Sequence, residues 1–121
     1  MARIHFIYST MNAGKSTALL QTNFSNLEKG MNTILYTSEK DNRYGNSEIV
    51  SRIGLKSKAE TFKNSDNLFD CVSKAHTKNA IDCVLIDEAQ FLTKDQVHQF
   101  GRVVDELDVT VIAYGIRTDF R

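Results

Sequence analysis

Proline and tryptophan are absent from this 121-residue sequence, and glycine occurs only six times. Chains that join two domains usually carry a linker rich in glycine, serine or proline, and no segment here has that composition. The sequence therefore predicts a single domain spanning residues 1–121. Its 41% apolar and 25% charged residues suit a globular domain with a hydrophobic core.

Cysteine is also scarce. The two thiols, Cys71 and Cys83, have no CxxC spacing. A disulfide framework or a zinc site cannot be built from these two cysteines alone. We therefore expect no zinc site within this chain, and a reducing, cytoplasmic location is the simplest expectation.

The sequence also has no excess of positive charge. Fifteen Lys and Arg residues balance fifteen Asp and Glu residues, and the pI is near 6.8. Dedicated binders of nucleic acid or of membrane surfaces normally need a basic excess. No apolar run approaches the roughly 20 residues needed to cross a bilayer, and residues 1–8 are too short for a secretory signal. We expect small-molecule chemistry, with neither a nucleic-acid partner nor a membrane.

Apolar runs and amphipathic patterns alternate along the chain. They predict strands at residues 4–8, 33–37, 59–62, 83–86 and 109–114, helices at 15–29, 67–78 and 93–107, and a loop at 39–45. Gly30 is expected to end the first helix and Thr93 to cap the last, whereas residues 49–55 fit either a strand or a turn. Strands alternating with helices predict a three-layer α/β fold with a mostly parallel sheet and right-handed crossovers.

A candidate phosphate loop lies between the first predicted strand and helix. The segment Ser9-Thr10-Met11-Asn12-Ala13-Gly14-Lys15-Ser16 matches the end of the pattern G-x-x-x-x-G-K-[ST], with Ser9 in place of the first glycine. Gly14 allows a tight turn, Lys15 supplies a cation and Ser16 a hydroxyl for Mg²⁺, while backbone N–H groups surround the phosphates. The alternative is a plain strand-to-helix turn with an exposed lysine.

Two carboxylates end the apolar run Val84-Leu85-Ile86-Asp87-Glu88. Asp87 is predicted to hold the water shell of Mg²⁺ across from Ser16. Glu88 points to the other side in an extended chain, so it is available as a general base toward a hydroxyl or a water. The alternative is that the acidic pair caps the amino end of a helix.

Arg43 follows the second predicted strand, in Asp41-Asn42-Arg43-Tyr44. It therefore emerges at the carboxyl edge where open α/β sheets bind ligands. There it could neutralise charge on a transferring phosphoryl group, the alternative being a solvated surface arginine.

These motifs together resemble one family. Five segments in chain order resemble the thymidine kinases of the cellular type-II family found in bacteria and phages: residues 11–17 (MNAGKST), 41–44 (DNRY), 51–55 (SRIGL), 87–92 (DEAQFL) and 114–121 (YGIRTDFR). The Asp-Glu-x-Gln-Phe sequence combined with the Asp-x-Arg-Tyr loop is the more specific part of the match. The resemblance implies a P-loop NTPase fold of the RecA-like type.

The resemblance also implies a reaction and the residues that carry it. The γ-phosphoryl group of ATP would pass to the 5′-hydroxyl of thymidine with Mg²⁺, in a homotetrameric enzyme. Glu88 would be the catalytic base and Arg43 would stabilise the transferred group, while Ser16 and Asp87 would order the metal. ATP would be bound by residues 9–17, through Ser9, Thr10, Met11, Asn12, Ala13, Gly14, Lys15, Ser16 and Thr17, and by Asp87. Thymidine would contact Met11, Phe91, Ile116 and Phe120; Gln90 receives no firm role.

The family pattern is not complete in this sequence. Members of the family continue with a zinc-bearing segment and a lasso-like loop over the nucleoside, so the resemblance implies an amino-terminal ATP-binding part. Two other functions stay open. One is a P-loop ATPase stimulated by DNA, and the other is an ATP-binding fragment without catalysis.

Overall fold

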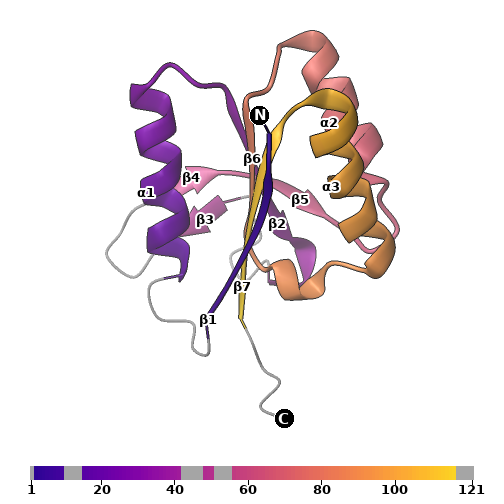
Figure 1. The fold of residues 1–121 in the computed structure, drawn as a ribbon. Helices are drawn as coiled ribbons and strands as arrows, with labels where there is room; N and C mark the ends of the chain where they lie inside the picture. The colour runs from indigo at the N-terminus through magenta and orange to yellow at the C-terminus, as the bar shows by residue number, and fades with distance from the viewer. Residues whose placement is uncertain (1, 10–14, 42–47, 51–55, 117–121) are drawn as a thin grey trace.

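The structure is a computed structural model that describes residues 2–9, 15–41, 48–50 and 56–116 (Figure 1). In six of these residues only the backbone is described: Ser9, Lys15, Ser16, Asp41, Glu48 and Val50. Strands form a central layer with helices on both sides, which confirms the predicted α/β class.

Within the described residues the main sheet has five strands, all parallel, in the order β1-β7-β6-β2-β5. These strands are β1 (Ile4–Ser9), β7 (Thr110–Ile116), β6 (Cys83–Ile86), β2 (Thr33–Ser38) and β5 (Glu60–Phe62). All four residues of β6 are buried, because this strand is the middle of the sheet and is covered on both faces. Its uninterrupted apolar sequence follows from that position.

The helices divide between the two faces of the sheet. Helix α1 (Lys15–Glu28) covers one face, and α2 (Leu68–Lys78) and α3 (Lys94–Leu107) cover the other (Figure 1). The chain crosses from β1 to β2 in one direction and returns through β6 and β7 in the opposite one. Right-handed crossovers in opposite directions require helices on opposite faces. The first strand-helix-strand unit thus joins strands that are not neighbours, since β7 and β6 lie between them.

Two apolar clusters fill the space between the layers. The cluster under α2 and α3 contains Val84, Ile86 and Phe100, and the cluster under α1 contains Leu20 and Leu85. Successive side chains of a strand point to opposite faces, so Leu85 serves one cluster while its neighbours serve the other. A strand with every position apolar is therefore needed to hold both layers.

Backbone and side-chain caps fix the helix ends. Gly30 has a φ of 76° and closes α1 with the hydrogen bonds Met31 N to Asn26 O (2.9 Å) and Gly30 N to Leu27 O (3.0 Å), the pair that defines a Schellman motif. Thr93 and Gln96 form a reciprocal capping box at α3. The predicted ends at Gly30 and Thr93 are confirmed.

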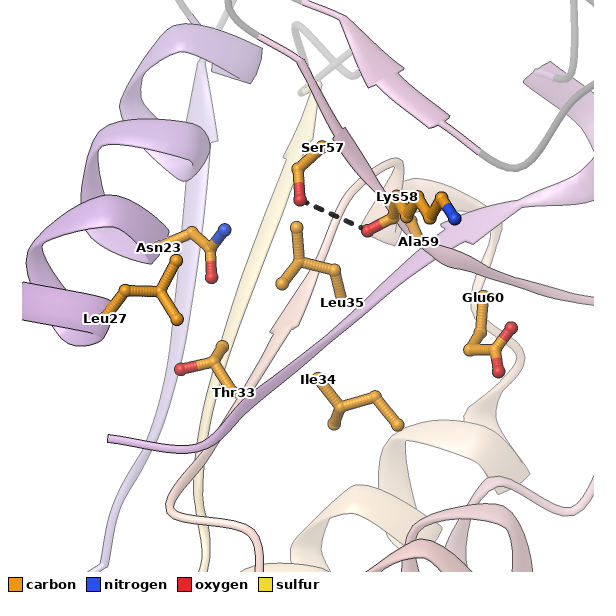
Figure 2. A pocket seen from close by; sticks show the side chains of 9 residues that line it. All are labelled: Asn23, Leu27, Thr33, Ile34, Leu35, Ser57, Lys58, Ala59 and Glu60. Atoms are coloured by element: carbon orange, nitrogen blue, oxygen red, sulfur yellow. Dashed lines mark hydrogen bonds between the residues drawn. The ribbon is translucent and has the colours of Figure 1, made fainter. Parts of the chain in front are cut away.

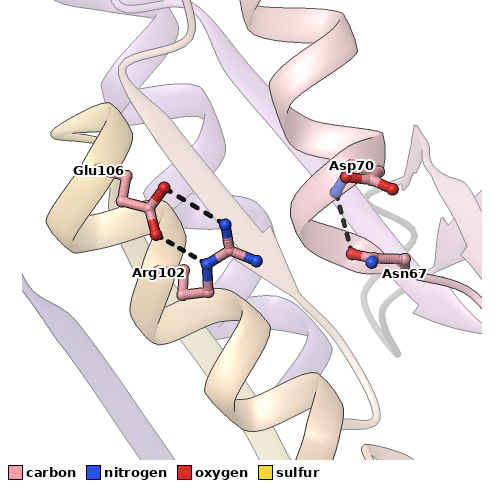
Figure 3. Close-up of polar contacts among 4 residues, drawn as sticks. All are labelled: Asn67, Asp70, Arg102 and Glu106. Atoms are coloured by element: carbon pink, nitrogen blue, oxygen red, sulfur yellow. Dashed lines mark hydrogen bonds and ion pairs between the residues drawn. The ribbon is translucent and has the colours of Figure 1, made fainter.

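Exposed polar contacts occur at the start of α2 and along α3 (Figure 3). Asn67 caps α2 by accepting a 3.1 Å hydrogen bond from the backbone of Asp70. On α3, Arg102 pairs with Glu106 at 2.7 Å, and its guanidinium lies 4.0 Å from the centre of the Phe69 ring on α2. Ion pairs this exposed contribute little to stability, so the buried clusters hold the two helices together.

Two predicted boundaries were wrong. The last strand continues to Ile116, beyond the predicted end at 114, because its final residue still pairs with Ser9 at the end of β1. The predicted strand at 59–62 begins at Glu60, and residues before it form β4 (Lys56–Lys58), which pairs antiparallel with β3 (Glu48–Val50). Residues 51–55 and 42–45 of the predicted segments lie outside the described residues, and residues 39–41 form the 3-10 helix η1 (Glu39–Asp41).

No helix in the described part of the chain is long and apolar enough to span a membrane.

Candidate active site

The carboxyl ends of three strands define the candidate site. Ser9 at the end of β1 pairs with Ile116 at the end of β7, and β6 ends at Ile86 beside Ala113 of β7. Because the strands are parallel, their carboxyl ends lie along one edge of the sheet (Figure 1). Open α/β sheets bind ligands at this edge.

The predicted phosphate loop has the expected strand and helix on either side. Strand β1 ends at Ser9 and α1 begins at Lys15, so residues 10–14 connect a strand end to a helix start at the carboxyl edge. The first turn of α1 contains no acidic residue, which leaves the positive end of the helix dipole uncompensated by its own side chains. The half-buried Thr17 lies in this turn. Its position fits an anion-binding helix start.

Asp87 and Glu88 follow β6 and are almost completely buried, with 4% and 5% of their surfaces exposed. The Asp87 N–H donates to the carbonyl oxygen of Tyr36 at 2.7 Å, and Asp87 Oδ1 accepts from the Glu88 N–H at 2.9 Å. Buried carboxylates are costly unless they are hydrogen-bonded or bind cations. Two in succession at a ligand-binding edge therefore indicate a functional site.

The backbone of Glu88 turns the chain sharply. Its φ of 59° and ψ of 42° lie in the left-handed region, which costs a residue with a side chain about 1 kcal/mol or more. The turn leads into the 3-10 helix η2 (Ala89–Phe91), but the Glu88 side chain makes no capping hydrogen bond to it. Glu88 thus occupies the N-cap position of η2 without a capping hydrogen bond from its side chain, and strain at such a residue is typical of functional positions.

Gln90 is the residue that the sequence pattern left without a role. Its Nε2 donates to Glu88 Oε1 at 2.6 Å, and its Oε1 accepts from the Ile116 N–H at 3.1 Å. The signals in the sequence are its place two residues after Glu88 and its part in the Asp-Glu-x-Gln-Phe sequence. The partner on β7 could not be found in that way, because it is 26 positions away along the chain.

Phe91, a predicted thymine contact, follows at the end of η2 and is half-buried. The Lys40 Nζ lies 5.5 Å from the centre of its ring. With its amide oriented to satisfy both neighbours, Asn64 donates to the Phe91 carbonyl oxygen and accepts from Lys40 Nζ, each at 3.1 Å. Ile116, the other predicted thymine contact among the described residues, ends β7 and is also half-buried. Both residues thus lie near the carboxyl edge.

Several predicted site residues lie outside the described residues: Thr10, Met11, Asn12, Ala13, Gly14, Arg43 and Phe120. Among the described side chains, no group of three His, Cys, Asp or Glu residues could hold a metal ion. The predicted magnesium role does not require such a group, because it was expected to use the hydroxyl of Ser16 and a water-mediated contact of Asp87. Their role therefore stays a prediction.

A cavity of about 460 Å³ lies elsewhere, between α1, β2 and the segment of β4 and β5 (Figure 2). It is lined by Asn23, Leu27, Thr33, Ile34, Leu35, Ser57, Lys58, Ala59 and Glu60. Thr33 begins β2, and Leu27 lies at the end of α1. The cavity thus lies toward the amino edge of β2, away from the two buried carboxylates, and we do not assign the nucleotide to it.

The fold and the site define an α/β protein of the P-loop NTPase-like type, with its polar residues at the carboxyl edge of a parallel sheet. Comparison with known proteins narrows this class. The family model described as thymidine kinase matches residues 2–121, and the chain belongs to the thymidine kinase family.

Curated relatives agree with the family match. The chain is 53% identical to a thymidine kinase of Escherichia coli (strain K12) and 51% identical to one of Salmonella choleraesuis, in each case over 100% of this chain and 59% of the relative. A thymidine kinase of Shewanella oneidensis is 50% identical over 100% of this chain and 63% of its own length. The chain thus spans about three fifths of the length of these relatives.

Proposed function

We propose that this chain is the ATP-binding part of a thymidine kinase, which transfers the γ-phosphoryl group of ATP to the 5′-hydroxyl of thymidine. The observation that carries the proposal is the buried, hydrogen-bonded Glu88 carboxylate at the edge where β1 leads into α1. Family membership supplies the substrate class, because the matched relatives are named thymidine kinases.

In this reaction the 5′-oxygen forms a new bond to the γ-phosphorus as the bond to the β,γ-bridging oxygen breaks. The hydroxyl proton passes to the Glu88 carboxylate, and ADP leaves with the bridging oxygen. A general base must lie within hydrogen-bond reach of the proton that it accepts. The restrained position of Glu88 at the carboxyl edge suits that role.

The remaining groups bind and orient the two substrates. Backbone N–H groups of residues 9–17 and the Lys15 ammonium would hold the phosphates, and Arg43 would balance charge on the transferred group. The oxygen-rich donor set fits Mg²⁺, since Asp87 and Ser16 both offer the hard ligands that this ion prefers. When bound, Mg²⁺ neutralises phosphate charge.

The thymine base is assigned to four apolar residues, of which Phe91 and Ile116 lie near the same edge. Phe91 and Phe120 would stack on the ring, and Met11 and Ile116 would border its 5-methyl group. For Phe91 the position of Lys40 Nζ over one face of the ring supports this assignment, because it restrains the ring from that side. Asn64 in turn binds Lys40 Nζ and the Phe91 carbonyl oxygen. A restrained ring stacks at a lower entropic cost.

The test is transfer of ³²P from [γ-³²P]ATP to thymidine, with deoxycytidine as the negative control. It is run on this chain and on a chimera in which residues 1–121 replace the matching part of the Escherichia coli relative. We expect labelled thymidine monophosphate from the chimera and a loss of turnover of about 100-fold or more in its Glu88→Gln variant. Nucleotide affinity should stay close to that of the parent.

Failure of the chimera to label thymidine would overturn the proposal. ATP hydrolysis stimulated by single-stranded DNA and indifferent to thymidine would indicate a motor-type ATPase. Binding of ATP without transfer by either protein would indicate a non-catalytic nucleotide-binding fragment. We also propose a homotetramer in the cytoplasm, which light scattering of the purified protein and localisation of a tagged copy would test.

A further inference from the structure

Gln90 joins two parts of the molecule that are far apart in sequence. Its amide group donates to Glu88 Oε1 at 2.6 Å and accepts from the Ile116 N–H at 3.1 Å. The orientation of the amide follows from the two partners, because a carboxylate only accepts and a backbone N–H only donates. A reversed amide would lose both hydrogen bonds.

The end of β7 is shaped to receive this side chain. Gly115 is buried immediately before Ile116, and a Cβ added there would lie 3.1 Å from Gln90 Oε1 and 2.7 Å from Tyr8 Cε1. The absence of a side chain at this position lets the Gln90 carboxamide approach the strand. Ile116 in turn pairs with Ser9, which ends β1 and is the first residue of the candidate phosphate loop.

Glu88 needs such a restraint more than most buried residues. It lies after the end of β6, in a left-handed conformation, so no regular ladder of backbone hydrogen bonds orients it. A glutamate side chain has three rotatable bonds, and a misplacement of about 1 Å in a reacting group can cost about 100-fold in rate. The short hydrogen bond from Gln90 restrains one of the two carboxylate oxygens and thereby contributes to the direction of the group.

We propose that Gln90 is a positioning residue for catalysis: it ties the Glu88 carboxylate to the backbone of β7 at Ile116. The base is thereby held in register with the strand end that also carries a predicted thymine contact. In this role Gln90 itself contacts neither ATP nor thymidine. The inference rests on the proposed role of Glu88 as the general base.

Two substitutions distinguish the hydrogen bond from Gln90 to Glu88 from the hydrogen bond between Gln90 and the Ile116 N–H. Gln90→Leu removes both, whereas Gln90→Glu keeps an oxygen that accepts from Ile116 N–H and places a second carboxylate against Glu88. Gln99→Leu is the matched control, because Gln99 is also half-buried and accepts from a backbone N–H, that of Leu68 at 2.8 Å, on the face of α3 toward α2. All three are made in the chimera, together with Glu88→Gln.

The measured quantities are kcat, the KM values for ATP and thymidine, the melting temperature, and the exchange rate of the Ile116 amide proton by NMR. We expect both Gln90 variants to lower kcat by about 10- to 100-fold with the KM for ATP changed by less than about twofold. Exchange at Ile116 should accelerate in Gln90→Leu and stay slow in Gln90→Glu. Gln99→Leu should keep the kcat of the parent.

Other results would overturn the inference. If Glu88→Gln abolishes turnover while both Gln90 variants keep the parental kcat, Gln90 does not position the base, although the proposed function stands. An equal fall of kcat in Gln99→Leu would show a general effect of lost stability. If Glu88→Gln keeps its turnover, the general base itself is misassigned and the inference falls with it. Should Gln90→Leu fail to fold, Gln90→Glu decides, since it preserves the shape and the contact with β7.

Discussion

The Asp87 N–H donates a 2.7 Å hydrogen bond to the carbonyl oxygen of Tyr36, one residue beyond the last paired position of β6 and β2 at Ile86. The sheet ladder thus holds the first carboxylate, and the chain turns into the left-handed region at the next residue, Glu88. Two adjacent acidic residues are consequently held in different ways. The backbone of Asp87 continues the hydrogen bonding of the sheet, whereas the carboxylate of Glu88 is held by a side-chain contact with Gln90.

The left-handed conformation of Glu88 leads to a prediction about stability. Glu88→Gly should be more stable than Glu88→Ala by about 1 kcal/mol, because glycine has no Cβ penalty at positive φ. Chemical denaturation of the two variants measures the difference, and both should lack kinase activity. Asp108 is the control: with a φ of 55° at the exposed end of α3, it should show the same Gly-over-Ala preference with activity retained. Equal stabilities of Gly and Ala at both positions would contradict the prediction.

Asp87→Asn tests the proposed magnesium role. The asparagine keeps an oxygen for the Glu88 N–H but loses the negative charge, so the fold should be preserved. We expect the Mg²⁺ concentration for half-maximal activity of the chimera to rise by about 10- to 100-fold. The matched control is Asp82→Asn, since Asp82 precedes the opposite end of β6 and also accepts from a backbone N–H, that of Asn32 at 2.7 Å. An unchanged magnesium requirement in Asp87→Asn would remove this residue from the metal site.

The substitution Gly115→Ala should destabilise the protein, although it adds only one methyl group. The new Cβ would collide with the Tyr8 ring at 2.7 Å and press on Gln90 Oε1 at 3.1 Å, which predicts a loss of about 1–3 kcal/mol in unfolding free energy. Gly101→Ala is the control, because a Cβ there meets nothing within 4 Å and the added methyl group lies in helix α3. It should stabilise the protein by about 0.5–1 kcal/mol. A Gly115→Ala variant as stable as the parent would show that Tyr8 moves aside freely.

The stability of the domain at alkaline pH should depend on Cys83. Burial raises the pKa of this thiol from 9.0 to about 11, Asp82 adds to the rise, and a hydrogen bond with Asn26 opposes it. Because the folded state binds the proton more tightly, the stabilisation is complete below pH 9 and is lost as the pH rises through 11. The stability difference between the parent and Cys83→Ala should therefore fall by roughly 2–3 kcal/mol over that window.

Denaturant titrations at several pH values measure this difference. Cys71→Ala serves as the comparison, because Cys71 is exposed and should give a smaller pH-dependent change. A difference between the parent and Cys83→Ala that does not vary with pH would contradict the prediction.

Local signals in the sequence were sufficient for much of the fold. The apolar run at 83–86 predicted a strand, and Thr93 and Gly30 marked helix ends through short-range hydrogen bonds. The same signals placed Asp87 and Glu88 after that strand. Each of these features depends on residues within a few positions of one another.

The wrongly predicted strand boundaries, in contrast, depend on residues that are distant in the sequence. The end of β7 was placed two residues early because Gly115 interrupts the apolar run, and pairing with β1 extends the strand through Ile116. Likewise, the split between β4 and β5 depends on pairing with β3 in one case and with β2 in the other. Pairing partners of this kind are distant in sequence, so periodicity alone could not identify them.

Periodicity and short-range chemistry in the sequence were sufficient for the α/β class, for the order along the chain of the main-sheet strands and the three α-helices, and for the two carboxylates at the end of a buried strand. Tertiary structure alone decided that β7 and β6 lie between β1 and β2, that Glu88 adopts a left-handed conformation, and that Gln90 connects Glu88 with Ile116. The physical reason is that strand order and the contacts of a side chain across the sheet edge are set by packing between segments distant in the chain.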